Sequence, residues 1–180
     1  VRSAGVAEGN TSLTDVPVKV ALSHASGKPV SVTYATADGS ATSPGDYAPA
    51  SGTLSLAPGE TEGVVHVAVR GDAAAEPDET LTVSLSQPDN ATVADASAAL
   101  TVTDDDPIVV AVASPSLPEG DAGTTPATFT VALDQAPPAG ETVSVDYEAK
   151  GVTASVPGDV AAATGTLTFG AGEKQKSVTV

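Results

Sequence analysis

The chain contains one long pattern twice, with the two copies about 110 residues apart. Glu8-Gly9 recurs as Glu119-Gly120, and Pro44-Gly45-Asp46 recurs as Pro157-Gly158-Asp159. This period is far above the roughly 20–50 residues of solenoid repeats and is typical of a whole small domain. We therefore expect two tandem units of the same fold.

The expected boundary divides the chain into residues 1–106 and residues 107–180. The second unit stops early, because it has no counterpart of residues 68–106 and so lacks about two strands. A sandwich without these strands would expose core and unpaired strand edges. We expect the chain to be a piece of a longer protein, with completion by a strand from a neighbouring chain as the alternative.

Hydrophobic residues alternate with polar ones, which indicates β-strands with one buried face. The pattern predicts inward positions within two segments, at Val18, Val20 and Leu22 and at Val30, Val32 and Tyr34. Further strands are expected over residues 52–56, 63–69, 80–86 and 98–103. About seven short strands in about a hundred residues predict an all-β fold, namely an immunoglobulin-like antiparallel β-sandwich.

The composition excludes several classes of partner. The 23 acidic residues outnumber the 7 basic ones and give a net charge of −16, which argues against nucleic acids and anionic membrane surfaces. No apolar run approaches the roughly 18 residues of a membrane span, so membrane insertion is not expected. The chain has no cysteine, and an extracellular protein without disulfides points to a bacterial source.

The acidic residues gather at the expected loops and strand ends. They are Glu8, Asp46, the segment Asp72–Glu79 and the run Asp104–Asp106. Several loops meet at one end of an antiparallel sandwich, and converging carboxylates repel one another unless a cation or water screens them. Ca²⁺ binds 6–8 oxygens and fits this donor set, whereas the lack of Cys and clustered His disfavours Zn²⁺. The alternative is a solvated acidic rim without metal.

The order of several motifs resembles the Calx-beta domain family. The motifs are Glu8-Gly9, Tyr34–Ala41, Gly45–Tyr47, Gly52–Leu54, Pro58–Glu60, Asp72, Glu76–Ser86 and Asp104–Asp106. They span the first copy almost end to end, and the second copy matches less faithfully. Members of this family are immunoglobulin-like sandwiches found in sodium–calcium exchangers, integrin β4 and many bacterial surface or secreted proteins. In the calcium-sensing members the ions cluster near the acidic tail.

The resemblance implies a set of calcium ligands in the first unit. These are Glu8, Asp46, Asp72, Glu76, Asp104, Asp105 and Asp106. Weaker candidates are Glu79, the backbone carbonyl of Ala74, and Glu119 and Asp159 in the second copy. One carboxylate fewer than the family pattern, at Gly71, favours one or two ions. Asp38 is expected to form a turn, and Asp78 to be solvated.

The sequence offers little for catalysis. It contains no Gly-x-Ser-x-Gly motif, and the spacing around His24 and His66 indicates surface histidines without Asp or Ser partners. We therefore expect a non-catalytic, calcium-binding spacer module of a bacterial surface or secreted multidomain protein, similar to an adhesin, in which Ca²⁺ stiffens the junction between units. The alternatives are a calcium-dependent module that recognises a glycan or protein, and an accessory domain of a secreted enzyme.

Overall fold

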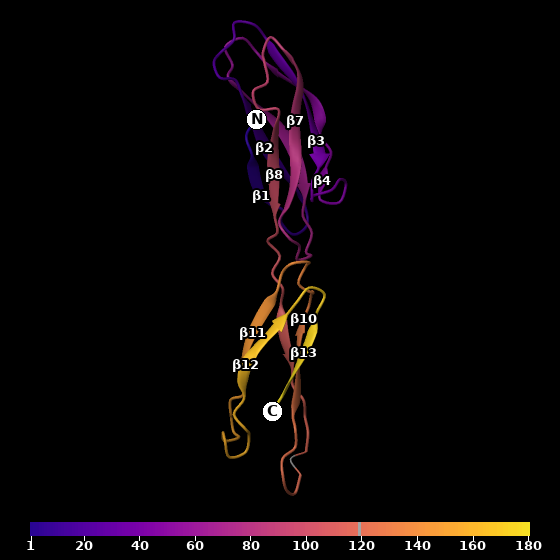
Figure 1. Ribbon diagram of the computed structural model, residues 1–180, viewed down its shortest axis with the longest axis vertical. Helices are drawn as coiled ribbons and strands as arrows, with labels where there is room; N and C mark the ends of the chain where they lie inside the picture. The colour runs from indigo at the N-terminus through magenta and orange to yellow at the C-terminus, as the bar shows by residue number, and fades with distance from the viewer. Residues whose placement is uncertain (119) are drawn as a thin grey trace. The chain divides into compact units, whose positions relative to one another are not determined.

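The computed structural model describes residues 1–118 and 120–180, which form thirteen strands and no helix (Figure 1). The strands of the first part are β1 (Ala4–Ala7), β2 (Leu13–Ala21), β3 (Val30–Asp38), β4 (Tyr47–Ala48), β5 (Ser51–Leu56), β6 (Glu62–Arg70), β7 (Glu79–Asp89) and β8 (Ser97–Thr103). Those that follow are β9 (Val110–Ala113), β10 (Thr128–Leu133), β11 (Val143–Glu148), β12 (Thr164–Phe169) and β13 (Gln175–Thr179). The all-β prediction is confirmed. No membrane-spanning helix is present in the described part of the chain.

The chain divides into two compact units, Val1–Asp106 and Pro107–Val180, here called unit 1 and unit 2. Unit 1 has a five-stranded sheet in the order β1-β8-β7-β3-β5 and a three-stranded sheet in the order β2-β6-β4. The pairs are antiparallel except for β1 and β8, which run parallel. Ala7 lies opposite Thr103 at the ends of these two strands. Glu8 and Asp104 therefore leave the same edge of the sheet side by side.

The core of unit 1 lies between its two sheets and follows the alternation of the sequence. Val18 and Val20 of β2 are buried, and so are Val30 and Val32 of β3. Each such side chain contributes about 1.5–3 kcal/mol when fully buried. Two of the expected inward positions are only half-buried: Leu22 lies beyond the end of β2, and Tyr34 covers Gly52 on the neighbouring strand.

The outer face of the five-stranded sheet carries one charged residue in the register of its described strands, Asp89, which lies opposite Ser31 at the end of β7. From β1 to β8, β7, β3 and β5 the other outward positions in this register hold small residues: Gly5, Ala7, Ser97, Ala99, Thr101, Thr103, Thr80, Thr82, Ser84, Ser86, Ser31, Thr33, Ala35, Ala37, Ser51, Thr53 and Ser55. In a chain of net charge −16 this leaves the acidic residues of this sheet at its strand ends and loops.

Unit 2 has a three-stranded sheet in the order β13-β10-β9 and a two-stranded sheet of β11 and β12. Its core contains Val131, Leu133 and Phe169. Among the described strands β11 pairs with β12 alone, whereas the equivalent β3 of unit 1 pairs with both β5 and β7. The second copy is thus a partial sandwich. Completion by a neighbouring chain stays a prediction.

Candidate metal centre

The parallel pair β1–β8 brings Glu8 to the acidic tail. Beyond the last paired residues, the Glu8 N–H donates to the Thr103 carbonyl at 3.1 Å. The next backbone N–H, of Gly9, donates to the Asp105 carboxylate at 3.0 Å across 96 residues of sequence. Segment 8–9 therefore continues the strand pairing and lies along the triple aspartate.

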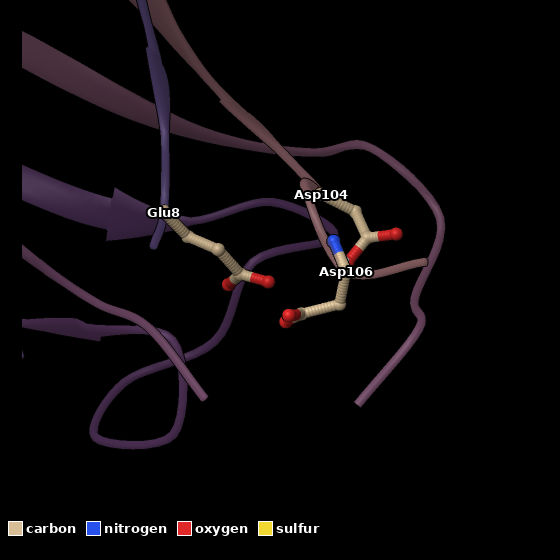
Figure 2. A group of neighbouring side chains, drawn as sticks. All are labelled: Glu8, Asp104 and Asp106. Carbon is tan, nitrogen blue, oxygen red and sulfur yellow. The ribbon is translucent and has the colours of Figure 1, made fainter. Parts of the chain in front are cut away.

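Three of the expected ligands form a compact cluster. Glu8, Asp104 and Asp106 each offer one carboxylate oxygen, and these oxygens lie within 4.8 Å of one another. Figure 2 shows the Glu8 and Asp106 carboxylates turned toward one another. Oxygens bound to the same Ca²⁺ at about 2.3–2.6 Å are separated by at most about 5 Å. The spacing of the cluster therefore fits one calcium ion.

Two oxygens of this cluster are buried and have no hydrogen-bond partner. They are Glu8 Oε1 and Asp106 Oδ2. The two residues are only 6% and 8% exposed, and they are the buried charged residues among those the structure describes. A buried carboxylate oxygen without a partner is costly, since it loses water and gains nothing in return. A cation between the two carboxylates would supply the missing partner.

A sharp steric constraint places the β6–β7 loop against the same segment. A Cβ atom at Gly71 would lie 1.4 Å from the Gly9 carbonyl oxygen and 2.7 Å from that of Glu8. The Gly71 N–H also donates to the Ser12 carbonyl at 3.2 Å. The sequence showed Gly71 only as the loss of a family carboxylate. The structure shows that this position has no room for a side chain and that the contact brings the following Asp72 toward Glu8.

The electrostatics of Glu8 reflect this convergence. Burial, and after it the negative charges of Asp72, Glu76, Asp104 and Asp106, together raise the pKa of Glu8 from its ordinary 4.5 to about 7. The β6–β7 loop and the acidic tail therefore act on the same carboxyl group.

A second set of carboxylates lies within electrostatic reach. The pKa of Glu76 is raised by burial and then by the charges of Asp72, Asp46 and Asp104. The pKa of Glu79 is raised by burial, by the charges of Asp46 and Glu76, and by a hydrogen bond with Asp46. The candidate ligands on three loops of unit 1 thus share one negative field.

Several of the expected ligands also hold backbone groups. Asp105 accepts from Gly9, and Asp72 Oδ1 accepts from the Ala74 N–H at 2.7 Å. Asp78, expected to be merely solvated, accepts from the Asp104 N–H at 3.2 Å and so anchors the acidic tail. These bonds aim the loops at the cluster but occupy one oxygen of each side chain.

Asp46 and Asp159 close equivalent loops. Asp46 Oδ2 accepts from the Thr42 N–H at 2.6 Å and from its hydroxyl at 3.1 Å, and Asp159 Oδ2 accepts from both groups of Ser155 at 2.8 Å. These bonds lower the pKa of Asp159. Its recurrence in unit 2 therefore has a structural reason in this loop, and its role as a weaker ligand stays a prediction. The other unit 2 candidate, Glu119, lies outside the described residues.

The expected turn role of Asp38 agrees with its contacts. Its Oδ1 accepts from the Tyr47 hydroxyl at 2.6 Å and from the Ser43 N–H at 3.0 Å, and these two bonds lower its pKa. The carboxylate thus ties β3 to the loop that carries Asp46.

Both histidines lie on the surface as predicted, but the expectation that they have no Asp or Ser partner was wrong. His66 Nδ1 lies 2.7 Å from Asp15 Oδ2 on the neighbouring strand, and His24 Nδ1 lies 2.9 Å from the hydroxyl of Ser23. Sequence spacing does not reveal the first pairing, because the two residues come close only through the register of β2 with β6, where His66 lies opposite Pro17.

Sequence reasoning also missed Asn10. Its side-chain amide donates to Asp106 Oδ1, at the edge of the cluster. Asn10 begins an Asn-x-Ser/Thr motif, and a neutral amide gives no signal among carboxylates.

The sequence model of the Calx-beta domain matches residues 3–106 and again residues 103–180, so the chain belongs to the Calx-beta domain family. No curated protein sequence matches it significantly.

Solved structures of Calx domains are similar to this chain. The apo-form Calx CBD1 domain is 28% identical with a TM-score of 0.51, over 58% of this chain and 91% of that one. The calcium binding domain CBD12 of CALX1.1 is 23% identical with a TM-score of 0.54, over 99% of this chain and 71% of that one. CBD12 from CALX1.2 is 24% identical with a TM-score of 0.54, over 98% and 70%. The two CBD12 likenesses support the tandem fold.

Gly71→Ala tests the steric constraint at the β6–β7 loop. The added methyl group cannot fit against Gly9, so we expect the variant to lower the stability of unit 1 by about 1–3 kcal/mol, as overpacking does. Chemical denaturation followed by circular dichroism measures the change. Gly27→Ala is the matched control, because a Cβ there meets no atom within 4 Å. Equal stability of the two variants would contradict the constraint.

The raised pKa of Glu8 predicts a pH dependence in the presence of a chelator. Between pH 4.5 and about pH 7 the folded protein binds more protons at Glu8 than the unfolded chain does. The free energy of unfolding therefore falls as pH rises through this window. Thermal melts of unit 1 should show a steeper loss of Tm from pH 5 to pH 7.5 in the wild type than in Glu8→Gln. Equal slopes would rule out this contribution of Glu8.

Proposed function

We propose that unit 1 binds Ca²⁺ through the carboxylate cluster and that the chain is a non-catalytic, calcium-stabilised module. The observation that carries this proposal is the pair of buried, unpartnered oxygens, Glu8 Oε1 and Asp106 Oδ2, in a cluster whose oxygens lie within 4.8 Å. Membership of the Calx-beta domain family supports it, as does the similarity to a domain described as calcium binding.

The cluster residues Glu8, Asp104 and Asp106 would hold the first ion. Asp72 and Glu76 raise the pKa of Glu8 and are the next candidates to complete a shell of 6–8 oxygens. Asp46 and Glu79 are candidates for a second ion together with Glu76, because the charges of Asp46 and Glu76 both raise the pKa of Glu79. We therefore propose one or two ions in unit 1. Asp105 is assigned to the Gly9 backbone.

Calcium would stabilise the folded state by neutralising the repulsion between the carboxylates that surround Glu8. A ligand that binds only the folded protein stabilises it by about 2.7 kcal/mol at a hundredfold excess over Kd. Hard oxygen donors without cysteine select Ca²⁺ over softer metals.

We further propose that the module is a spacer of a bacterial surface or secreted protein. Asp104–Asp106 close unit 1, and Pro107 opens unit 2 with no intervening linker. An ion held by the acidic tail would therefore stiffen the chain where the units join. The absence of cysteine and the oxygen-only site suit an extracellular location.

A calcium titration by calorimetry tests the site. Glu8→Gln and Asp106→Asn are each expected to weaken binding at least about tenfold, because each removes a charged ligand from the buried cluster. Asp95→Asn, an exposed acidic residue in the loop between β7 and β8, removes the same charge elsewhere and should bind like the wild type. Absence of calcium binding to the wild type, or equal affinities in all variants, would refute the proposal.

Distance measurement across the junction tests the spacer role. The chain has no cysteine, so the double variant Ser55→Cys and Thr142→Cys places one fluorescent label on an exposed residue of each unit. Single-molecule energy transfer should show a narrower distance distribution in Ca²⁺ than in chelator. Adding Asp106→Asn should abolish the narrowing. An unchanged distribution in calcium-saturated protein would reject stiffening while leaving calcium binding intact.

A further inference from the structure

Asn10 makes the last of three successive hydrogen bonds between segment 8–10 and the acidic tail. Glu8 donates to Thr103, Gly9 donates to Asp105, and Asn10 donates to Asp106. The first two bonds use backbone N–H groups and follow from the parallel pairing of β1 and β8. The third uses a side chain, so its presence depends on the identity of residue 10.

This third bond determines which oxygen of Asp106 is left for a cation. Oδ1 receives the Asn10 amide, whereas Oδ2 is buried and has no partner. The terminal torsion of an Asp side chain is broad, so a carboxylate without a donor has no fixed plane. A donor on one oxygen restricts this rotation. The other oxygen then stays turned toward Glu8, as Figure 2 shows for the two carboxylates.

The backbone around Asn10 is itself held firmly. Gly9 has a φ of +76°, a left-handed conformation that glycine adopts without strain, and its carbonyl is packed against Gly71. Two residues after Asn10, the carbonyl of Ser12 accepts a hydrogen bond from the Gly71 N–H. The amide of Asn10 is therefore presented to Asp106 from a fixed turn.

The chemistry of the amide suits this task. An Asn side chain donates N–H groups and carries no charge, whereas an Asp at this position could only accept and would add to the repulsion. A Lys would bring a positive charge that competes with a metal ion for the carboxylates. No such competition arises from the ion pairs of the described residues, because their basic members, His66, Lys150 and Lys176, pair with carboxylates outside the cluster.

We propose that Asn10 is a positioning residue of the calcium site: its amide fixes the Asp106 carboxylate so that Oδ2 faces the cation shared with Glu8. This inference rests on the proposed calcium binding of unit 1. It adds that affinity depends on a neutral donor that does not itself bind the ion.

The test compares calcium affinities of the full chain by calorimetry for three variants. Asn10→Ala should weaken binding about tenfold, since a hydrogen bond to a charged group is lost. Asn10→Gln, which keeps an amide donor, should recover most of the affinity. Asn90→Ala is the matched control, because its amide donates to the Pro29 carbonyl at 2.8 Å in a different loop. It should bind like the wild type.

A second readout needs no calcium. In chelator, the side-chain amide resonances of Asn10 should shift in Asp106→Asn but not in Asp95→Asn. The backbone shifts of segment 8–12 in Asn10→Ala, corrected for residue type, should still report the wild-type conformation. Unshifted amide resonances, or loss of the segment's backbone structure in Asn10→Ala, would overturn the positioning role.

The outcomes separate the two proposals. If the wild type binds calcium and Asn10→Ala binds equally well, the role of Asn10 is wrong and the calcium site stands. Equal losses in Asn10→Ala and Asn10→Gln would also overturn the role of the amide. If the wild type binds no calcium, both proposals fail.

Discussion

The parallel pairing of β1 with β8 is the interaction on which the rest of unit 1's acidic end depends. It is the parallel pair in an otherwise antiparallel set of described strands, and its register places Ala7 beside Thr103. Parallel strands end at the same edge, so the residues that follow them meet although 96 positions separate them. Without this pair, Glu8 and Asp106 would have no reason to be neighbours.

Bringing carboxylates together in this way lowers the free energy of unfolding of the metal-free protein. Glu8 and Asp106 are buried with one unpartnered oxygen each, and the pKa of Glu8 rises to about 7. The same features favour a cation, because its charge offsets both the lost hydration and the repulsion. A lower stability without an ion and a gain of stability with one would therefore be two consequences of one arrangement.

Recurrence of a carboxylate in both units does not by itself mark a ligand. Asp46 and Asp159 recur because each closes its own loop through a Thr or Ser four residues earlier. The cluster of unit 1 depends instead on the acidic tail after β8, whose counterpart the described strands of unit 2 do not include. A carboxylate that recurs in both units thus indicates a shared loop structure. The proposed metal site depends in addition on the acidic tail of unit 1.

The sequence by itself determined the repeat, the all-β sandwich and the positions of most core residues, because alternation along a strand specifies which side chains share a face. It also predicted that the carboxylates lie in loops and at strand ends. Only the tertiary structure decided which of them meet. The closeness of Gly71 to Gly9, the turn of Asp105 toward a backbone N–H, and the bond from Asn10 to Asp106 all join segments about 60 to 100 residues apart. Such contacts follow from strand order and register, which no local pattern encodes.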